Sequence, residues 1–311
     1  MKISTEAITW LKGIKFGYTY KDKIILFLYI LNAIIVIIFV ISIFGKRKAI
    51  EIYFKRTYLV NWIPVKSVLA KKDGIMLSLP MILDYIILLK SNWEEKEREF
   101  VTKLNLNDSN AIIIDVGANI GIYAILLACV YPKAKVIAIE ASQTIFDKLK
   151  SNCELNNNVL VASHIMLINK AVSDVDDKTV ELYEEHSMST ILEEFLIRLI
   201  FSNDEQQLNR NIVRTITIDN LVATVGLNEI SLLKLDVEGA EVLALKGAIH
   251  TLNQKKIKNM LIEYHSVENY NCIIKLLQEL GYVVVVSSQE QYQISTNTEY
   301  INGHIIATLS K

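Results

Sequence analysis

Short apolar segments recur along the second two-thirds of the chain, separated by stretches of helical length. Residues 143–155 are one such stretch, in which Ile145, Leu149 and Cys153 recur at the spacing of one helical face. The apolar segments are residues 111–115, 135–140, 164–172, 231–236, 259–264, 282–287 and 304–310. Buried parallel strands have this continuous apolar character, and their alternation with helices predicts an open α/β sheet. The last two segments have no room for a helix between them, so one of them should pair antiparallel.

A longer apolar run stands apart from this pattern, near the start of the chain. Residues 24–44 (IILFLYILNAIIVIIFVISIF) hold one asparagine and no charge over 21 residues. About 20 apolar residues span a bilayer as a helix, and buried core helices are usually shorter. The run is too long for a signal peptide and lacks a small-residue cleavage site. It predicts a single transmembrane helix, with a buried soluble helix as the alternative.

Basic residues flank this run on both sides, more densely after it. Five follow it and four precede it: Lys46, Arg47, Lys48, Lys55 and Arg56, against Lys12, Lys15, Lys21 and Lys23. The excess favours a cytoplasmic side for everything C-terminal to the run.

The organisation that follows has four parts. Residues 1–23 form a tail, 24–44 the anchor, 45–105 a lead-in, and 106–311 an α/β domain. The lead-in should contain a hairpin turning at residues 71–74 and a helix over 81–102. Residues 188–212 interrupt the alternation of strands and helices, and we expect an insertion there that covers substrate.

Composition excludes several classes of protein. Net charge is −1 and no basic patch is interleaved with aromatic residues, so the sequence does not indicate nucleic-acid binding. Three cysteines are scattered without a C-x-x-C pair, which argues against a disulfide framework or a zinc site. Hydrophobic residues reach 51%, in keeping with a membrane segment.

Residues 112–124 (IIIDVGANIGIYA) read as a strand, a glycine turn and a helix start. Gly117 and Gly121 allow a ligand to approach the backbone closely, and Asp115 ends the strand where open α/β sheets bind ligands. Glu140 ends the next strand, where an acid can accept both hydroxyls of a ribose. The ordered set predicts a nucleotide-type pocket. The alternative is a tight turn with two solvated acids.

The turn also indicates which nucleotide. Dinucleotide sites use G-x-G-x-x-G, whereas this turn is G-A-N-I-G with Asn119 at its centre. An acid two residues before the first glycine is a poor neighbour for pyrophosphate. It suits S-adenosylmethionine, which carries a sulfonium and an ammonium and no phosphate.

These motifs resemble those of the FkbM-type class I methyltransferases. The resemblance rests on DVGANIG, VIAIE, NKAVSD, TIDNL and above all KLDVEGAEVLALKGA, and covers roughly residues 90–285. It implies a seven-stranded Rossmann-like sheet, S-adenosylmethionine as donor, and usually O-methylation of a hydroxyl. By the same resemblance the donor-binding residues are Asp115, Gly117, Asn119, Gly121 and Glu140, with Ala171, Ser173 and Asp174 near the adenine.

Three carboxylates follow the fourth strand, in the stretch SLLKLDVEGAE. Asp236 precedes the next helix and should face the crevice, which favours a catalytic or substrate-orienting role with Glu238 as its partner. Glu241 is a candidate for substrate binding, although an acid at a helix N-terminus is also favourable without any function.

A second candidate base lies at the end of the fifth strand. His265 has the more convenient unperturbed pKa for proton transfer, although it could equally be a locally hydrogen-bonded histidine. Glu263, one pleat earlier, could orient His265 or the substrate.

A divalent metal held by Asp236, Glu238 and Glu263 is conceivable, but no ligand spacing demands one, so we predict none. The remaining histidines show no metal-like spacing and read as ordinary surface or strand residues: His164, His186, His250 and His304.

The sequence therefore predicts a membrane-anchored S-adenosylmethionine-dependent methyltransferase. Its acceptor would be a hydroxyl of a sugar, glycan or lipid-linked molecule, and its donor places the catalytic part in the cytoplasm. One alternative is a tethered module that binds the donor or a partner without catalysis. The other is a nicotinamide-dependent oxidoreductase, whose third glycine and Tyr-x-x-x-Lys pair are not evident.

Overall fold

The computed structural model describes residues 17–31, 67–80, 93–106, 110–156, 165–185, 188–190, 209–295 and 298–309. The chain divides into two compact units, residues 1–95 with 197–206, and residues 96–196 with 207–311.

In the first unit, the described residues form a helical segment and a hairpin. The helical segment covers residues 20–31 and is capped reciprocally by Thr19 and Asp22. Strands β1 (Ser67–Lys72) and β2 (Ile75–Pro80) pair antiparallel about a turn at Asp73 and Gly74, which confirms the predicted hairpin. The helix predicted over 81–102 is described only at its end, as α4 (Glu95–Thr102).

Within the described residues, no helix combines the length and apolar character needed to cross a bilayer. Of the predicted span, residues 24–31 lie in the helical segment, and residues 32–44 lie outside the described part of the chain.

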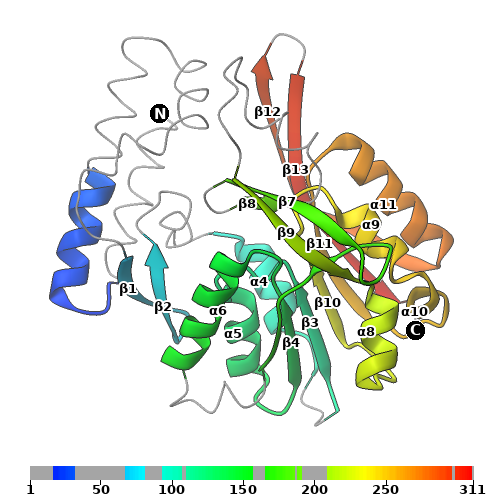
Figure 1. The fold of residues 1–311 in the computed structure, drawn as a ribbon, viewed down its shortest axis with the longest axis horizontal. Coiled ribbons are helices and arrows are strands. Elements are labelled where there is room, and N and C mark those ends of the chain that lie inside the picture. The colour runs from blue at the N-terminus through cyan, green and yellow to red at the C-terminus, as the bar shows by residue number, and fades with distance from the viewer. Residues whose placement is uncertain are drawn as a thin grey trace. The chain divides into compact units, whose positions relative to one another are not determined.

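The second unit is built on the predicted seven-stranded sheet (Figure 1). Its order is β12-β13-β11-β10-β3-β4-β5. The parallel strands are β3 (Ile112–Val116), β4 (Lys135–Ile139), β5 (Ile165–Ile168), β10 (Leu232–Leu235) and β11 (Asn259–Tyr264). Strand β13 (Thr298–Leu309) pairs antiparallel with both β11 and β12 (Tyr282–Ser295), as predicted for the last two segments.

Helices pack on both faces of this sheet. One face carries α5 (Ile122–Val130) and α6 (Gln143–Leu155), and the other carries α8, α9, α10 and α11 (Figure 1). The latter span Ile218–Val225, Glu241–Lys246, Ile249–Asn253 and Val267–Glu279. Alternate residues of each strand therefore enter different cores, and Leu233 and Leu235 of β10 join the apolar cluster under α8 to α11.

The third predicted strand, residues 164–172, is wrong as a single element. Residues Ile165–Ile168 form β5, but Ala171–Val172 leave the sheet as β6 and pair with β9 (Asn209–Ile216). The cause lies between them, where Asn169 Nδ2 donates to the carbonyls of Glu140 and Ala141 at 2.8 and 3.0 Å. These hydrogen bonds fix the end of β5 beside the end of β4, and the backbone that follows pairs with β9 in a second sheet.

That second sheet has the order β6-β9-β7-β8, with β7 at Thr179–Glu185 and β8 at Met188–Thr190. Its strands β8 and β9 contain the described ends of the predicted insertion at 188–212. Residues 191–208 lie outside the described part of the chain.

Candidate functional site

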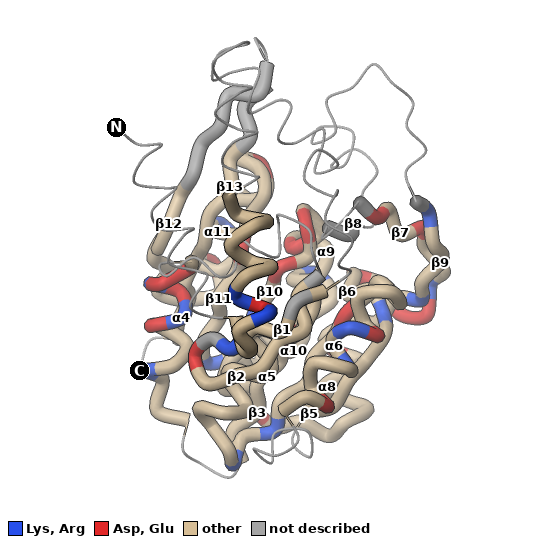
Figure 2. Tube along the Cα trace, turned by 90° about the vertical axis from the view of Figure 1, so that its left-hand side faces the viewer, with Lys and Arg blue, Asp and Glu red and all other residues tan. Residues whose placement is uncertain are grey.

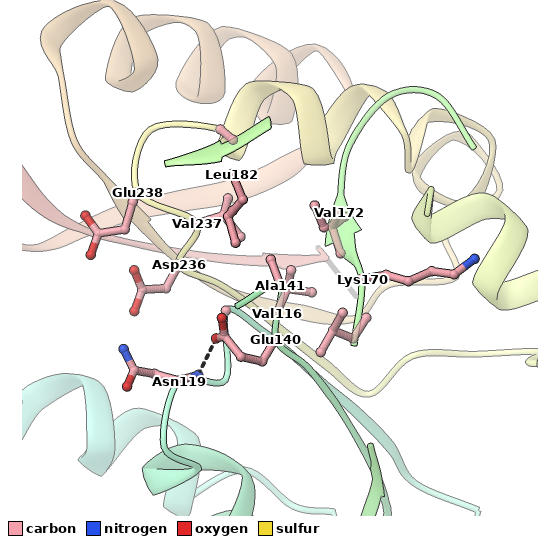
Figure 3. Close-up of a pocket in the computed structure, with 14 residues that line it drawn as sticks. Val116, Asn119, Glu140, Ala141, Lys170, Val172, Leu182, Asp236, Val237 and Glu238 are labelled. Carbon is pink, nitrogen blue, oxygen red and sulfur yellow. Dashed lines mark hydrogen bonds between the residues drawn. The ribbon is translucent and has the colours of Figure 1, made fainter. Parts of the chain in front are cut away.

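A pocket of about 540 Å³ opens at the carboxyl ends of the parallel strands. Its walls come from the turns after β3, β4 and β10 and from strands β6 and β7 (Figure 3). The donor-side turn after β3 (residues 117–121) and the acidic turn after β10 (residues 236–241), called here the first and second corners of the site, therefore both contribute to the same pocket.

The turn after β3 is held tightly against its neighbours. The backbone N–H groups of Gly117 and Ala118 donate to Ile139 O at 2.9 and 3.0 Å. Gly117 has a φ of +72°, and a Cβ there would lie 1.7 Å from the carbonyl oxygen of Asp236. Asn119 also takes a left-handed conformation, with φ +51°, which asparagine tolerates better than most residues. Only glycine fits position 117, because any side chain there would overlap the backbone carbonyl of Asp236 in the turn after β10.

Glu140 is placed as the sequence predicts, at the end of β4 and in the wall of the pocket. Its carboxylate accepts a hydrogen bond from the backbone N–H group of Asn119 at 2.9 Å (Figure 3). It accepts a second one, also at 2.9 Å, from the backbone N–H group of Ser142. The residue is 4% exposed, and burial raises its pKa to about 7 despite these hydrogen bonds. A carboxylate so oriented can accept the hydroxyl groups of a ribose.

Two predicted donor residues support the turn without lining the pocket. Asp115 is fully buried, and burial raises its pKa. Gly121 begins α5 in a left-handed conformation with φ +95°. Both lie outside the pocket wall, so the predicted direct contact of either residue with the donor is not seen in the lining of the pocket.

The predicted adenine segment lies only partly at the pocket. Ala171 and Val172 of β6 line it, together with Leu182 of β7. Ser173 is buried behind them, and its backbone N–H donates to Ile216 O at 3.1 Å. Asp174 is exposed. The wall nearest this segment is therefore apolar, as a stacked base requires.

The second corner places Asp236 and Glu238 in the pocket wall, next to the donor-side turn. Figure 2 shows the acidic residues gathered near β10 and α9, and Figure 3 shows both side chains beside Glu140. Glu238 has φ +50°, a strained conformation for a residue other than glycine. Such strain persists only where neighbouring structure imposes it, and it recurs at functional sites.

Glu241 holds the backbone on either side of Glu238 by accepting hydrogen bonds from it. Its Oε1 accepts from the backbone N–H groups of Val237 and Gly239 at 3.2 and 3.0 Å. Its Oε2 accepts from Asn269 Nδ2 at 2.6 Å. Glu241 is fully buried and outside the pocket wall, so its place in the structure is to hold the turn rather than to meet substrate directly.

His265 is also buried, at 4% exposure, and lies among three carboxylates. Its Nδ1 is 3.0 Å from Glu241 Oε1, and its Nε2 is 3.4 Å from Glu238 Oε2 and 3.6 Å from Glu263 Oε1. Burial lowers the pKa of His265, but Glu241 and Glu238 overcome this and raise it well above its usual value. In this arrangement His265 is an imidazolium at neutral pH, which makes it a poor proton acceptor.

The carboxylates around His265 titrate in opposite directions. Burial, followed by the charges of Asp236 and Glu263, raises the pKa of Glu238 to about 8 against the effect of His265. Burial also opposes ionisation of Glu263, but His304, with Nε2 3.5 Å from Glu263 Oε2, lowers the pKa of Glu263 to about 2. The site thus holds a protonated carboxyl and an ionised one close together.

His304 corrects an expectation from the sequence. It is a strand residue, on β13, but it is buried and pairs with Glu263 rather than facing solvent. No short-range spacing reveals this, because β13 reaches β11 only through antiparallel pairing at the far end of the chain.

Sequence reasoning also passed over Lys234 and Asn269. Lys234 is a lysine within an otherwise apolar strand, and that irregularity is visible in SLLKLD. Asn269 lies in the first turn of α11 and carries no comparable signal.

The residues present fit S-adenosylmethionine. Three carboxylates, Glu140, Asp236 and Glu238, line the pocket, while the ammonium of Lys170 points away from them (Figure 3). The negative charge of Asp236, and of Glu140 once it ionises, suits a cationic ligand without phosphate.

A metal is not required by this geometry. Asp236, Glu263 and His265 each offer a ligand atom within 4.8 Å of the others. However, Lys234 Nζ already lies 3.1 Å from Asp236 Oδ2, and His265 Nε2 lies 3.6 Å from Glu263 Oε1, so each carboxylate has a cationic partner.

Comparison with known proteins identifies the family. The Methyltransferase FkbM domain matches residues 115–284, from the first site acid to β12. This match confirms the predicted family and S-adenosylmethionine as its donor.

Individual relatives are more distant. The methyltransferase sdnD of Sordaria araneosa is 28% identical over 175 residues, covering 50% of this chain and 66% of that protein. The hexuronic acid methyltransferase AglP of Haloferax volcanii is 25% identical over 174 residues, covering 55% and 63%. The antimetabolite synthetase AmbE of Pseudomonas aeruginosa matches over 8% of its length. The chain thus spans less than two-thirds of each of these three relatives.

Among solved structures, a methyltransferase FkbM from Methylobacillus flagellatus aligns at 15% identity with a TM-score of 0.40. The alignment covers 65% of this chain and 47% of that one. The family match spans more than half of the chain, and its motifs converge on one pocket. The chain therefore belongs to the FkbM methyltransferase domain family.

Proposed function

We propose that this chain is an S-adenosylmethionine-dependent O-methyltransferase that acts on a hydroxyl group of a sugar, glycan or lipid-linked acceptor. The observation that carries the proposal is that Glu140 and Asp236 line one pocket from the ends of different strands. We assign Glu140 to the donor and Asp236, on the neighbouring turn, to the acceptor.

S-adenosylmethionine, when bound, supplies an activated methyl group and leaves as S-adenosylhomocysteine. Glu140 accepts the ribose hydroxyls, and the apolar wall of Ala171, Val172 and Leu182 packs against the base. Alignment of the acceptor oxygen supplies much of the acceleration of such a displacement.

Asp236 is the group we assign to remove the acceptor's proton. Burial raises its pKa, which makes it more basic, while Lys234 at 3.1 Å opposes its protonation. Glu238, protonated near neutral pH, donates a hydrogen bond to the acceptor or to Asp236 instead of competing for the proton. His265 already carries a proton, and its Nδ1 lies 3.0 Å from Glu241, the residue that holds the turn.

The charges at the pocket bear on the acceptor. The relative AglP is a hexuronic acid methyltransferase, which supports a sugar as the acceptor of this chain. Asp236, when ionised, repels an anionic group placed beside it, so a neutral sugar hydroxyl suits this wall better than a uronate.

We also propose that residues 24–44 anchor the chain in a bilayer as a single-pass helix, with the catalytic part in the cytoplasm. The support is their length, their lack of charge and the basic cluster after them. Alkaline carbonate extraction of membranes and protease protection of each end test this proposal. Release of the chain by carbonate would overturn it.

The donor is tested by calorimetric titration of the full-length chain, in detergent, with S-adenosylmethionine and S-adenosylhomocysteine. Binding should be lost in Glu140→Ala and kept in Glu154→Ala, an exposed acid on α6. No binding to the folded wild type would favour a module without catalysis. Fluorescence of reduced nicotinamide cofactor on mixing would reveal the oxidoreductase.

The acceptor is tested by transfer of a labelled methyl group. Octyl glucoside, glucose and glucuronic acid are offered in parallel, as a lipid-like glycoside, a soluble neutral sugar and an anionic one. Transfer to octyl glucoside above glucose supports an amphiphilic acceptor, whereas equal rates count against it. Preferred transfer to glucuronic acid would contradict the charge argument.

A further inference from the structure

Lys234 is a charged residue in a fully buried strand. All four residues of β10 are buried, and Lys234 itself is 5% exposed among Leu232, Leu233 and Leu235. Lysine is almost never buried unless it is paired, because desolvation of the ammonium is costly. A buried lysine therefore requires charged or polar partners that offset the free-energy cost of desolvating its ammonium.

Those partners are two carboxylates, Asp236 directly after β10 and Asp115 on the neighbouring strand β3. Lys234 Nζ lies 3.1 Å from Asp236 Oδ2 and 3.7 Å from Asp115 Oδ1. Strands β10 and β3 are parallel neighbours, and Lys234 is the register partner of Asp115. The ammonium also lies 5.1 Å from the ring centroid of Tyr123 on α5, a favourable cation–π distance.

We infer that Lys234 is a positioning residue that keeps Asp236 ionised and oriented at the pocket, acting through its direct ion pair with that carboxylate. This inference rests on the proposed function, in which Asp236 removes the acceptor's proton. Lys234 lies below the pocket and does not line it, so it acts on the acceptor only through Asp236.

The charged neighbours of Asp236 make this role specific. The other groups that act on it are four carboxylates and one imidazolium: Asp115 on β3, Glu140 after β4, Glu238 on the turn after β10, Glu263 on β11 and His265 after β11. All these carboxylates favour protonation of Asp236 when ionised. Lys234 lies 3.1 Å from Asp236, and among the cationic groups it opposes that protonation most strongly, ahead of His265.

The test is a titration of Asp236 itself, which does not depend on knowing the acceptor. Infrared spectra of the full-length chain carrying ¹³C-labelled aspartate are recorded across pH, and the Asp236 band is assigned by subtraction of the Asp236→Asn spectrum. In Lys234→Met, which keeps side-chain volume but removes the charge, the midpoint should rise by at least about one pH unit, or tenfold in proton affinity. In Lys234→Arg it should stay near that of the wild type.

Two controls separate positioning from stability. Lys258→Gln removes another ion pair of this unit, with Glu229 at 3.2 Å, and should leave the Asp236 midpoint unchanged. The double variant Asp115→Asn/Lys234→Met removes one buried acid with the ammonium, so it should regain thermal stability over Lys234→Met. Its Asp236 midpoint should remain raised, because the direct pair is still absent.

Two results would overturn the inference. One is an unchanged Asp236 midpoint in folded Lys234→Met, and the other is full recovery of the midpoint in the double variant. Failure of the proposed function is seen separately, as absence of S-adenosylhomocysteine binding by the wild type.

Discussion

Nδ1 of His265 lies 3.0 Å from Oε1 of Glu241, and the same oxygen accepts hydrogen bonds from the turn that carries Glu238. One buried carboxylate therefore sets both the orientation of the imidazole and the strained backbone beside the pocket. Replacing Glu241 should therefore alter both the titration of His265 and the stability of the turn that carries Glu238.

Glu241→Gln should lower the pKa of His265, because Glu241 contributes the largest effect that raises it. The amide would also set an N–H group against donors that now meet a carboxylate, so the variant should lose a few kcal/mol of stability, about what breaking a buried pair costs. Nuclear magnetic resonance titration of the ¹⁵N-labelled imidazole and thermal unfolding measure both effects. Glu268→Gln, an exposed acid in the first turn of α11, is the control. An unaltered His265 titration in Glu241→Gln would contradict this electrostatic account.

Stability should fall as pH rises from about 5 to about 8. Glu140 and Glu238 have pKa values raised from 4.5 to about 7 and about 8, and that of His265 is raised above 6.5. In each case the folded state binds more protons than the unfolded state in this window, so its advantage is lost on deprotonation. Glu263, with its pKa lowered to about 2, acts oppositely and only below pH 4.5.

Thermal unfolding at a series of pH values checks this prediction. Glu238→Gln should flatten the decline, because it removes one of the titrating groups, whereas Glu279→Gln at the exposed end of α11 should keep it. A wild-type stability that rises through this window would show that other groups dominate.

Donor affinity should increase as pH rises through about 7, where Glu140 ionises and becomes a stronger acceptor for the ribose hydroxyls. Glu140→Gln should bind S-adenosylhomocysteine roughly 10- to 100-fold more weakly, the usual effect of losing hydrogen bonds to a charged group. Its affinity should also no longer depend on pH in this range. Calorimetry gives both quantities, and a variant with the wild-type pH profile would assign the titration elsewhere.

Gly117→Ala should destabilise the chain far more than Gly226→Ala. Both glycines have φ near +70°, where an L-residue costs about 1–2 kcal/mol. A Cβ at Gly226 meets nothing within 4 Å, whereas one at Gly117 overlaps the Asp236 carbonyl. Equal melting temperatures for the two variants would mean that the two corners are not in backbone contact.

Local sequence patterns predict most strands and helices of the main sheet and several residues of the pocket wall. The helix at Gln143–Leu155 and the strand at Asn259–Tyr264 have the predicted bounds, because a continuous apolar run or a helical stripe specifies each. Gly117, Asn119, Glu140, Asp236 and Glu238 could be placed at one pocket because parallel strands present their ends at the same edge.

The side-chain pairings of the site and the ionisation states that follow from them could not be predicted from local patterns, because they depend on contacts between distant segments. The pairing of Glu263 with His304 requires β13 to lie beside β11, and the ion pair of Lys234 with Asp115 requires β10 to lie beside β3. The ionisation of His265 likewise follows from three carboxylates brought together by folding, which reverses the role suggested by its unperturbed pKa.

The departure of the chain from the main sheet at Asn169 gives the pocket two walls of separate construction. The wall of Glu140 and Asp236 is fixed by the seven-stranded sheet, whereas Ala171 and Leu182 belong to the four-stranded one. Substitutions at Ala171 or Leu182 can therefore reshape the apolar wall while the strands that carry Glu140 and Asp236 keep their register.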